Sequence, residues 1–386
     1  MLSGLLGTKR WPIALDIGTE SVKMLQMHQA GGGIAVRSSA QWRLPATGPH
    51  EGDAWRKLVV GAVLDMLRTG GFRGRRVVSC LSCGQLKIKN VRLPSMSPAE
   101  LAEALHWEAK ERFGCDFAPD QLHYLLAGQV RQGVESYQEI ILLAAPGEVV
   151  EERLSMLHEM GLQPDRIEPE PTAMFRPFER RLRRRADEDC ITVVVDLGHL
   201  SSKVVVARGR DIVLVKTISV GGRKLSEAVA RQLHLSDEEA GDLRIQIMRE
   251  QTVASEAGPD SRPDPNSMSW TIVDALRTEV EELAREIALC LRYCSVTFRG
   301  LRPKEITITG GQAYDAAVIR LLGEHLGVSC QVGQPLKGVD ISAADLGTDR
   351  RGMLTEWNVC AGLAFHYAET SRRSRKEDHE RDRLSA

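Results

Sequence analysis

One short motif occurs twice in this chain, at an interval the size of a domain. The segments Asp16–Lys23 and Asp196–Lys203 both read D-[IL]-G-x-x-S-x-K, and they begin 180 residues apart, at positions 16 and 196. An apolar run precedes each copy and another follows it. This pattern predicts a strand, a tight turn and a second strand, with the aspartate at the mouth of the turn. The repetition predicts two similar halves.

The residue types in this motif suit a phosphate group bound beside a metal ion. Gly18 and Gly198 stand two positions after each aspartate, where glycine lets the backbone approach a ligand closely. Backbone N–H groups in such a turn form a concavity that fits phosphate. Asp16 and Asp196 can hold Mg²⁺, mostly through water, and Lys23 can supply a counter-charge. One copy alone would suggest an ordinary hairpin, whereas two copies suggest two halves that face one nucleotide.

A pair of glycines follows a β-branched strand late in the chain. The strand Ile306–Thr309 leads into Gly310, Gly311 and Gln312, and an apolar helical pattern continues to Leu326. Adjacent glycines let the backbone lie flat against a base or a ribose. A plain strand-to-helix turn would give the same pattern, so the nucleoside contact is a hypothesis that depends on the two earlier motifs.

The two Asp-x-Gly turns and the late glycine pair together resemble the actin-like ATPase superfamily. Three further segments resemble the PilM family of type IV pilus and type II secretion systems, which is related to FtsA. They are the P-x-M, E-L and W-E pattern over 92–109, the AAP and GL pattern over 139–162, and the GG-x-x-L-[ST] turn over 219–227. The resemblance covers residues 10–368. It implies an α/β actin-like ATPase fold, with two similar RNase H-like lobes around a nucleotide cleft and an inserted small subdomain.

The resemblance, read with the strand and helix pattern, also implies a division into domains. The first lobe takes residues 10–89 and 166–189, and the inserted small subdomain takes 90–165. The second lobe takes 190–369, with a smaller subdomain at about 217–304. The tail, 370–386, has almost no apolar residues and is expected to be disordered. A length of 386 residues exceeds one simple core and agrees with two lobes.

The resemblance implies ATP with Mg²⁺ as the bound cofactor. The expected contacts come from the two turns, the GG turn, the helix that starts near 237 and the late glycine pair. These residues are Asp16, Gly18, Thr19, Glu20, Lys23, Asp196, Gly198, His199, Gly222, Glu239, Arg244, Gly310, Gly311 and Gln312, and the metal ligands are Asp16 and Asp196.

Hydrolysis of ATP would need a polar residue that orients water at the γ-phosphate. Glu170 is the first catalytic candidate and Glu168 the second, although a carboxylate there also suits the N-terminus of the helix predicted at 171–181. Two residues depart from the family pattern: His199 stands where a small residue is usual, and Gly241 where a second glutamate is usual. These departures favour slow or absent hydrolysis and leave open whether the protein is an enzyme.

The function implied by the resemblance is that of a cytoplasmic ATP-binding scaffold in a pilus or secretion machine. Its inserted subdomain would dock the N-terminal peptide of a PilN-like inner-membrane protein, so the chain would be peripheral to that membrane through its partner. Self-association stays open. One alternative is a small-molecule kinase of the same superfamily, but no clear substrate insertion is present. Another is an FtsA-like membrane filament, but the tail is charged throughout and lacks an amphipathic pattern.

Composition argues against several other classes of protein. The net charge is −1, which gives no support for a nucleic-acid surface. No apolar run approaches the roughly 18–20 residues that cross a bilayer. Cys80 and Cys83 form a C-x-x-C, but no second such pair or histidine pair stands at zinc-ligand spacing. Buried, reduced thiols are therefore expected. The arginine-rich stretch at 180–185 is expected to be a solvated helix end before a hinge.

Overall fold

Two five-stranded sheets of the same topology form the body of the protein. The computed structural model describes residues 11–45, 48–49, 51–132, 135–254, 267–298, 300–346 and 353–368. In spatial order, the first sheet contains β3 (Gly33–Arg43), β2 (Ser21–Ala30), β1 (Ile13–Ile17), β4 (Arg76–Leu81) and β8 (Gln163–Pro169). The second contains β11 (Asp211–Ile218), β10 (Ser202–Arg208), β9 (Ile191–Leu197), β12 (Glu305–Thr309) and β13 (Ser329–Val332).

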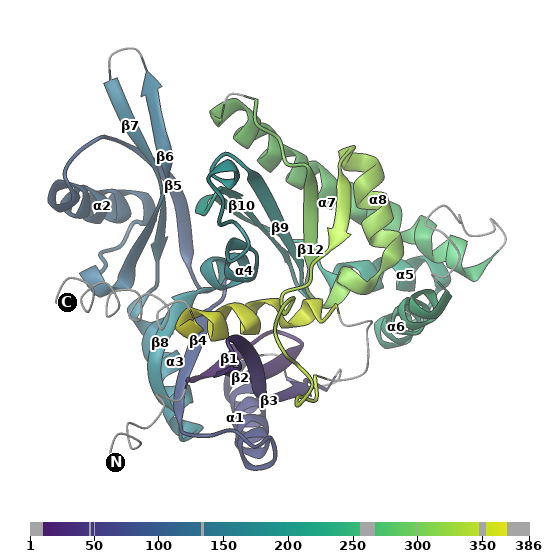
Figure 1. The fold of residues 1–386 in the computed structure, drawn as a ribbon. Helices are drawn as coiled ribbons and strands as arrows, with labels where there is room; N and C mark the ends of the chain where they lie inside the picture. The colour runs from purple at the N-terminus through teal and green to yellow at the C-terminus, as the bar shows by residue number, and fades with distance from the viewer. Residues whose placement is uncertain are drawn as a thin grey trace.

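Strand direction repeats between the two sheets as well. In each sheet the motif-bearing strand, β1 or β9, pairs antiparallel with the strand that follows it, and a third strand pairs antiparallel with that one. The remaining two strands run parallel to β1 or β9. In Figure 1 the first sheet lies below the second. The expected two-lobed α/β fold is confirmed.

The first lobe includes a helix that the sequence had assigned to the inserted subdomain. Helices α1 (Gly52–Thr69) and α3 (Gly147–Glu159) pack on the first sheet, and Met156 and Leu157 of α3 share one buried core with Val59 and Val63 of α1. The expected subdomain boundary at 165 therefore differs from the structure, because α3 buries its apolar face on the first lobe.

Strand β8 was not among the expected elements. Its sequence, QPDRIEP, contains Pro164 and Pro169 and lacks an alternating apolar pattern. It lies at the edge of its sheet and pairs with β4 alone. Proline is tolerated at a sheet edge because that position has no second neighbour to which a backbone N–H must donate.

The inserted subdomain consists of a three-stranded sheet and one helix. Its elements are β5 (Lys87–Pro94), α2 (Pro98–Phe113), β6 (Leu122–Gln132) and β7 (Glu135–Ala144), with the strand order β5-β7-β6. Ser97 begins α2 with a capping box to Glu100. One face of the sheet shares a core with α2, whereas Ile141 and Leu143 of the other face belong to the core of the second lobe. The sheet is therefore enclosed between α2 and that lobe.

The helices of the second lobe are α5 (Gly222–Leu233), α6 (Asp237–Ala254), α7 (Met268–Thr297) and α8 (Ala316–Leu326). Leu276, Val280, Leu283 and Ile287 are buried and form an apolar stripe along α7 at steps of three and four residues. Figure 1 places α5 and α6 on the side of this lobe away from the inserted subdomain. This group of helices contributes one wall of the cavity described below.

Two helices cross between the lobes. They are α4 (Glu170–Glu179) and the last helix, over 358–368. A Cβ atom added at Gly362 would lie 1.8 Å from the Ala173 carbonyl oxygen, so only glycine permits this close crossing. Arg176 Nη1 also donates to the Gly362 carbonyl at 2.7 Å.

Other expectations concern the surface and the thiols. Cys80 and Cys83 are buried free thiols, as expected, and burial raises the pKa of both.

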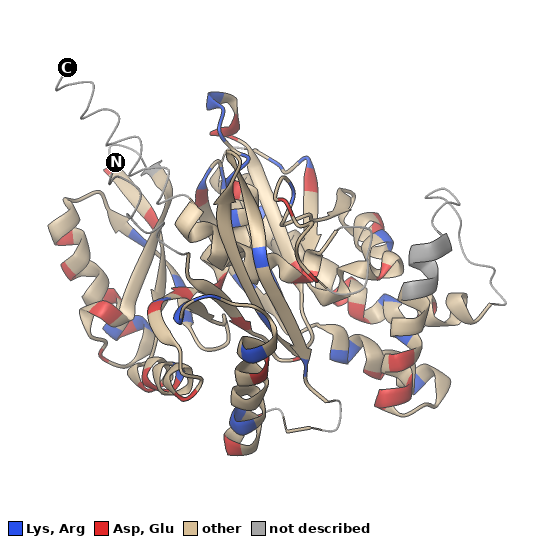
Figure 2. Cartoon of the chain, turned by 60° about the horizontal axis from the view of Figure 1, so that its bottom comes forward, with Lys and Arg blue, Asp and Glu red and all other residues tan. Residues whose placement is uncertain are grey.

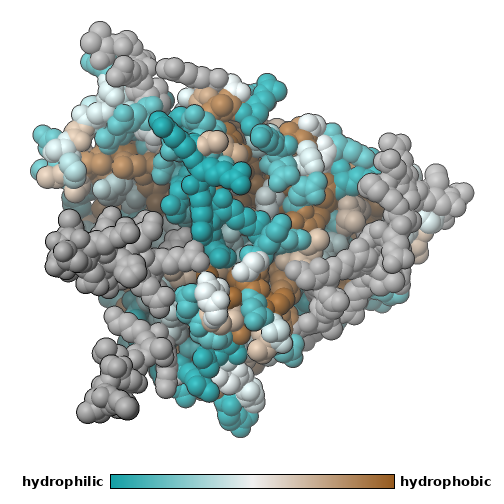
Figure 3. Space-filling view, viewed as in Figure 1, coloured by the Kyte–Doolittle hydropathy of each residue, from teal (hydrophilic) through white to brown (hydrophobic). Residues whose placement is uncertain are grey.

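The 180–185 segment is mostly exposed at the end of α4, where Figure 3 shows a hydrophilic band. Acidic and basic residues are interspersed in Figure 2. Within the described residues, none of the helices combines the length and apolarity that a bilayer span requires. The tail expected to be disordered, 370–386, lies outside the described residues.

Candidate functional site

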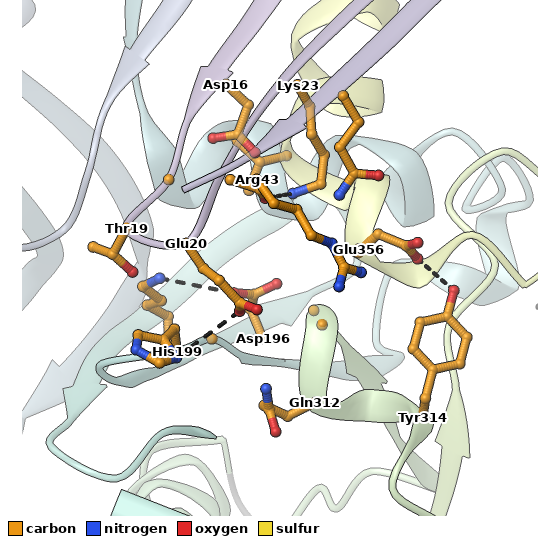
Figure 4. A pocket seen from close by; sticks show the side chains of 18 of the residues that line it. Asp16, Thr19, Glu20, Lys23, Arg43, Asp196, His199, Gln312, Tyr314 and Glu356 are labelled. Carbon is orange, nitrogen blue, oxygen red and sulfur yellow. Dashed lines mark hydrogen bonds and ion pairs between the residues drawn. The ribbon is translucent and has the colours of Figure 1, made fainter. Parts of the chain in front are cut away.

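A cavity of about 530 Å³ lies where the two motif turns face each other. Its volume lies within the roughly 300–1,000 Å³ typical of small-molecule sites. Figure 4 shows side chains from both lobes that point into this space. The predicted site residues that line it are Asp16, Gly18, Thr19, Glu20, Lys23, Glu170, Asp196, Gly198, His199, Gly310, Gly311 and Gln312.

The two turns have matching backbone geometry. In each, the aspartate lies directly opposite the lysine of the same motif across the strand pair. A Cβ atom added at Gly18 would lie 3.0 Å from the Ser21 carbonyl oxygen, and one at Gly198 would lie 2.8 Å from the Ser201 carbonyl oxygen. Both turns are therefore too tight for a side chain, and the backbone of each is open to a ligand.

The two lysines have different partners. Lys23 Nζ donates to the Ser21 hydroxyl at 2.8 Å. Lys203 Nζ lies 3.3 Å from Glu170 Oε1 and 3.8 Å from Asp196 Oδ2, and these carboxylates raise the pKa of Lys203 although burial opposes them. The second motif thus places its cation between two acidic residues, one of which belongs to α4.

The two motif aspartates are held in an environment that disfavours their charge. Burial raises the pKa of Asp16 to about 6; Lys23 opposes the shift, whereas Glu170 and Asp196 add to it. Burial also raises the pKa of Asp196, against the attraction of Lys203. Two carboxylates crowded in this way would gain from a hard cation, since Mg²⁺ prefers carboxylate and phosphate oxygens together with water. The donor set therefore fits Mg²⁺ bound with a phosphate.

Glu170 and Glu168 occupy different environments. Glu170 lines the cavity at the start of α4, where its Oε2 accepts from the Cys83 backbone N–H at 2.7 Å. Glu168 lies outside the lining; its carboxylate is 2.7 Å from Arg176 and 2.9 Å from His366. Burial favours the neutral form of Glu168, but the contacts with His366 and Arg176 outweigh it and lower the pKa of Glu168. Glu170 could therefore contact a phosphate bound in the cavity, whereas Glu168 could not.

A contact between His199 and Glu20 joins the two turns across the cleft. His199 Nδ1 lies 3.9 Å from Glu20 Oε2, and Figure 4 shows these side chains facing each other. The departure noted at His199 therefore brings an imidazole to the part of the cavity between the two turns, opposite a carboxylate of the other lobe.

Three predicted residues do not line the cavity. Glu239 is exposed and completes a capping box with Ser236 before α6, which explains its position without a ligand. Gly222 and Arg244 lie behind Gln312: Arg244 donates to the Gly222 carbonyl and to Gln312 Oε1. At this wall of the cavity, α6 contributes Ile245 and Met248 instead of Glu239 and Arg244.

Sequence reasoning missed other lining residues, which are Ser21, Gln41, Arg43, Lys203, Ile245, Met248, Tyr314, Glu356 and Val359. Lys203 was visible as the lysine of the second motif. Gln41 and Arg43 enter through sheet register, since β3 places them opposite Lys23 and Ser21. Tyr314 donates to Glu356, a contact between distant segments for which the sequence has no local signal.

Solved structures with a similar fold support the two-lobed architecture. The "PilM-PilN type IV pilus biogenesis complex" has a TM-score of 0.72 and 24% identity, covering 93% of this chain and 99% of that chain. Ethanolamine utilization protein EutJ from Carboxydothermus hydrogenoformans has a TM-score of 0.53 and 14% identity, covering 92% and 90%. MreB5 of Spiroplasma citri bound to ADP has a TM-score of 0.50 and 11% identity, covering 96% and 99%.

A family match assigns the chain more narrowly than the fold does. Residues 14–256 match the family described as "Type IV pilus assembly protein PilM". This match spans well over half of the chain, including both motif turns and the inserted subdomain. The chain therefore belongs to the PilM family of type IV pilus assembly proteins.

Proposed function

We propose that this protein is an actin-like, ATP-binding scaffold of a type IV pilus machine that docks the N-terminal peptide of a PilN-like inner-membrane protein. The observation that carries the nucleotide part is the pair of matching turns facing one cavity. The partner part rests on membership of the PilM family and on the similar fold of a PilM–PilN complex. The proposed location is the cytoplasm, peripheral to the inner membrane through the partner.

Each part of the cavity has a proposed role toward Mg²⁺-ATP. Asp16 and Asp196 would hold Mg²⁺, largely through its water molecules. Lys23 and Lys203 would balance phosphate charge, while the backbone N–H groups of both turns cradle phosphate oxygens. The glycines at 310–311 would lie against the nucleoside, with the lining side chains Ile245, Met248 and Tyr314 available to the base. An MreB protein of similar fold is bound to ADP.

Hydrolysis is proposed to be slow or absent. Glu170, the proposed catalytic residue, is already paired with Lys203 and the Cys83 N–H. These two contacts limit how far the Glu170 carboxylate can turn to orient a water molecule. His199 also occupies the phosphate end of the cavity. Nucleotide would then act chiefly as a clamp between the lobes.

The clamp predicts equal stabilisation by ATP and by a non-hydrolysable analogue. A ligand that binds only the folded state adds about 2.7 kcal/mol at one hundred times its dissociation constant. Thermal unfolding with Mg²⁺ should therefore shift upward by the same amount with either nucleotide. A steady turnover above about 1 per second, inside the usual enzyme range, would refute the clamp; loss of the shift with the analogue alone would do the same.

The proposed docking surface is the inserted subdomain. Its edge strand β6 carries Tyr124 and Leu126, which are 37% and 51% exposed, and α2 carries Trp107, which is 64% exposed. The exposed Tyr124 and Leu126 on this outer strand suit an extended peptide, which would bind through backbone hydrogen bonds and side-chain pockets. Ordering a flexible peptide offsets part of the contact energy, so affinity should be micromolar.

A matched pair of variants tests this surface. Leu126→Asp should weaken binding of the partner's N-terminal peptide by about tenfold or more, because a charge would be buried beneath the peptide. Leu64→Asp is the control, since Leu64 is 46% exposed on α1 of the first lobe. Amide exchange with wild-type protein should show peptide protection within 85–165. Protection confined to the second lobe, or equal affinities of both variants, would contradict the docking model.

A further inference from the structure

A buried arginine stands directly behind the cavity wall. Arg244 of α6 is 2% exposed. Its Nη1 donates to the Gly222 carbonyl at 3.0 Å and to the Ser226 hydroxyl at 3.1 Å. Its Nη2 donates to Gln312 Oε1 at 3.1 Å and to Asp315 Oδ2 at 3.0 Å. These four bonds use the four hydrogens that the two Nη atoms carry.

The carboxylate that holds this arginine is itself fixed. Asp315 is the N-cap of α8, and its Oδ1 accepts from the Val318 N–H. Its other oxygen pairs with Arg244, and both side chains are buried. A capped helix start therefore sets the position of the guanidinium, and the guanidinium keeps its charge because arginine does not deprotonate in proteins. Arg244 has little freedom to turn away from Gln312.

This arrangement determines which way the Gln312 amide faces. An arginine has donors only, so the atom of Gln312 that meets Nη2 must be the oxygen. The amide NH₂ must then face the other way, and Figure 4 shows the nitrogen directed toward the cavity and the oxygen away from it. Gly222 leaves room for this pose, since a Cβ atom there would lie 2.5 Å from the Gln312 amide nitrogen.

We propose that Arg244 is a positioning residue that locks the Gln312 amide so that it donates a hydrogen bond to an acceptor oxygen of the bound nucleotide. The acceptor lies on the sugar or on the first phosphate, because Gln312 packs on Gly222, whose N–H donates to Gly198 of the second phosphate turn. This inference rests on the proposed nucleotide function and adds a specific role for a pair that sequence reasoning assigned to direct contact.

The test replaces the donor without disturbing the arginine. In Gln312→Glu, one carboxylate oxygen still accepts from Arg244, and the other stands where the NH₂ group was. It would repel the acceptor oxygen, so the dissociation constant for AMP and for ATP should rise by about tenfold or more. Gln232→Glu makes the same chemical change at an exposed position on α5 and should leave both constants unchanged. Calorimetry without Mg²⁺ and with Mg²⁺ gives the constants.

A second variant separates positioning from structural support. Arg244→Lys removes the planar guanidinium, so the Gln312 amide can turn. The loss of nucleotide affinity caused by Gln312→Glu should therefore be smaller in the Arg244→Lys background than in wild type. The difference measures the coupling between the two residues. Titration with adenosine identifies the acceptor. If Gln312→Glu also weakens adenosine binding, the acceptor is on the sugar; if it weakens AMP binding but not adenosine binding, the acceptor is on the phosphate. Wild-type protein that binds no nucleotide would refute the proposed function. Wild-type and Gln312→Glu proteins that bind ATP and AMP equally well would overturn this inference alone.

Discussion

Asp16→Asn should stabilise the nucleotide-free protein at neutral pH and, in the same variant, remove Mg²⁺-dependent ATP binding. The pKa of Asp16 is raised from 3.8 to about 6 by burial. A group with a raised folded-state pKa binds its proton more tightly in the folded state, so its contribution to stability falls as the pH rises from about 4 to 6. Above pH 6 the ionised carboxylate costs roughly 1–3 kcal/mol, which asparagine avoids.

The measurement is urea unfolding of both proteins between pH 4 and pH 8, with and without Mg²⁺-ATP. Without nucleotide, the advantage of Asp16→Asn should be present at pH 7–8 and disappear toward pH 4. With Mg²⁺-ATP, wild type should gain stability and the variant should not, because the neutral amide is a poor partner for Mg²⁺. Asp242→Asn, at an exposed position on α6, is the control and should follow wild type throughout. An Asp16→Asn protein that is less stable than wild type at pH 7.5 would contradict the destabilising effect of the ionised Asp16 carboxylate.

Lys203→Met should destabilise the protein much more than Lys23→Met, and both substitutions should weaken nucleotide binding. Lys203→Met leaves the carboxylates of Glu170 and Asp196 buried without their nearest cation. Removing one partner from a buried ion pair typically costs about 3–5 kcal/mol. Lys23→Met removes a hydrogen bond to the Ser21 hydroxyl, worth about 0.5–1.5 kcal/mol, and the attraction of Lys23 for Asp16.

Urea midpoints of the two variants without nucleotide test this difference. Adding Glu170→Gln to Lys203→Met should recover part of the lost stability, since it removes one of the stranded charges. The same addition to Lys23→Met should recover less. Equal destabilisation by the two lysine changes would show that the Lys203 ion pairs do not hold the second turn.

The sequence predicted the fold well where a pattern repeats. The duplicated motif led directly to two lobes because the Asp and Lys of each copy are fixed opposite one another by strand register. The sequence predicted less about elements whose presence or position depends on tertiary packing. Strand β8 was missed because an edge strand tolerates proline, and α3 was placed in the wrong unit because its partner α1 lies far away in the sequence.

The same limit applies to the site. The turn residues were found because their chemistry is local to each motif. Arg43 and Glu356 were missed because each reaches the cavity from a segment without a motif of its own. Arg244 was predicted to contact the nucleotide directly, and only the packing of α6 shows that Gln312 lies between Arg244 and the cavity.

Amide exchange on addition of Mg²⁺-ATP tests most directly whether both turns bind one nucleotide. Binding in the cavity should slow exchange at residues 17–21 of the first turn, 198–202 of the second and 310–312 together, with one common dependence on ATP concentration. Asp16→Asn protein should show none of these changes. Protection of one turn without the other, or protection that persists in Asp16→Asn, would contradict a single site shared by the two lobes.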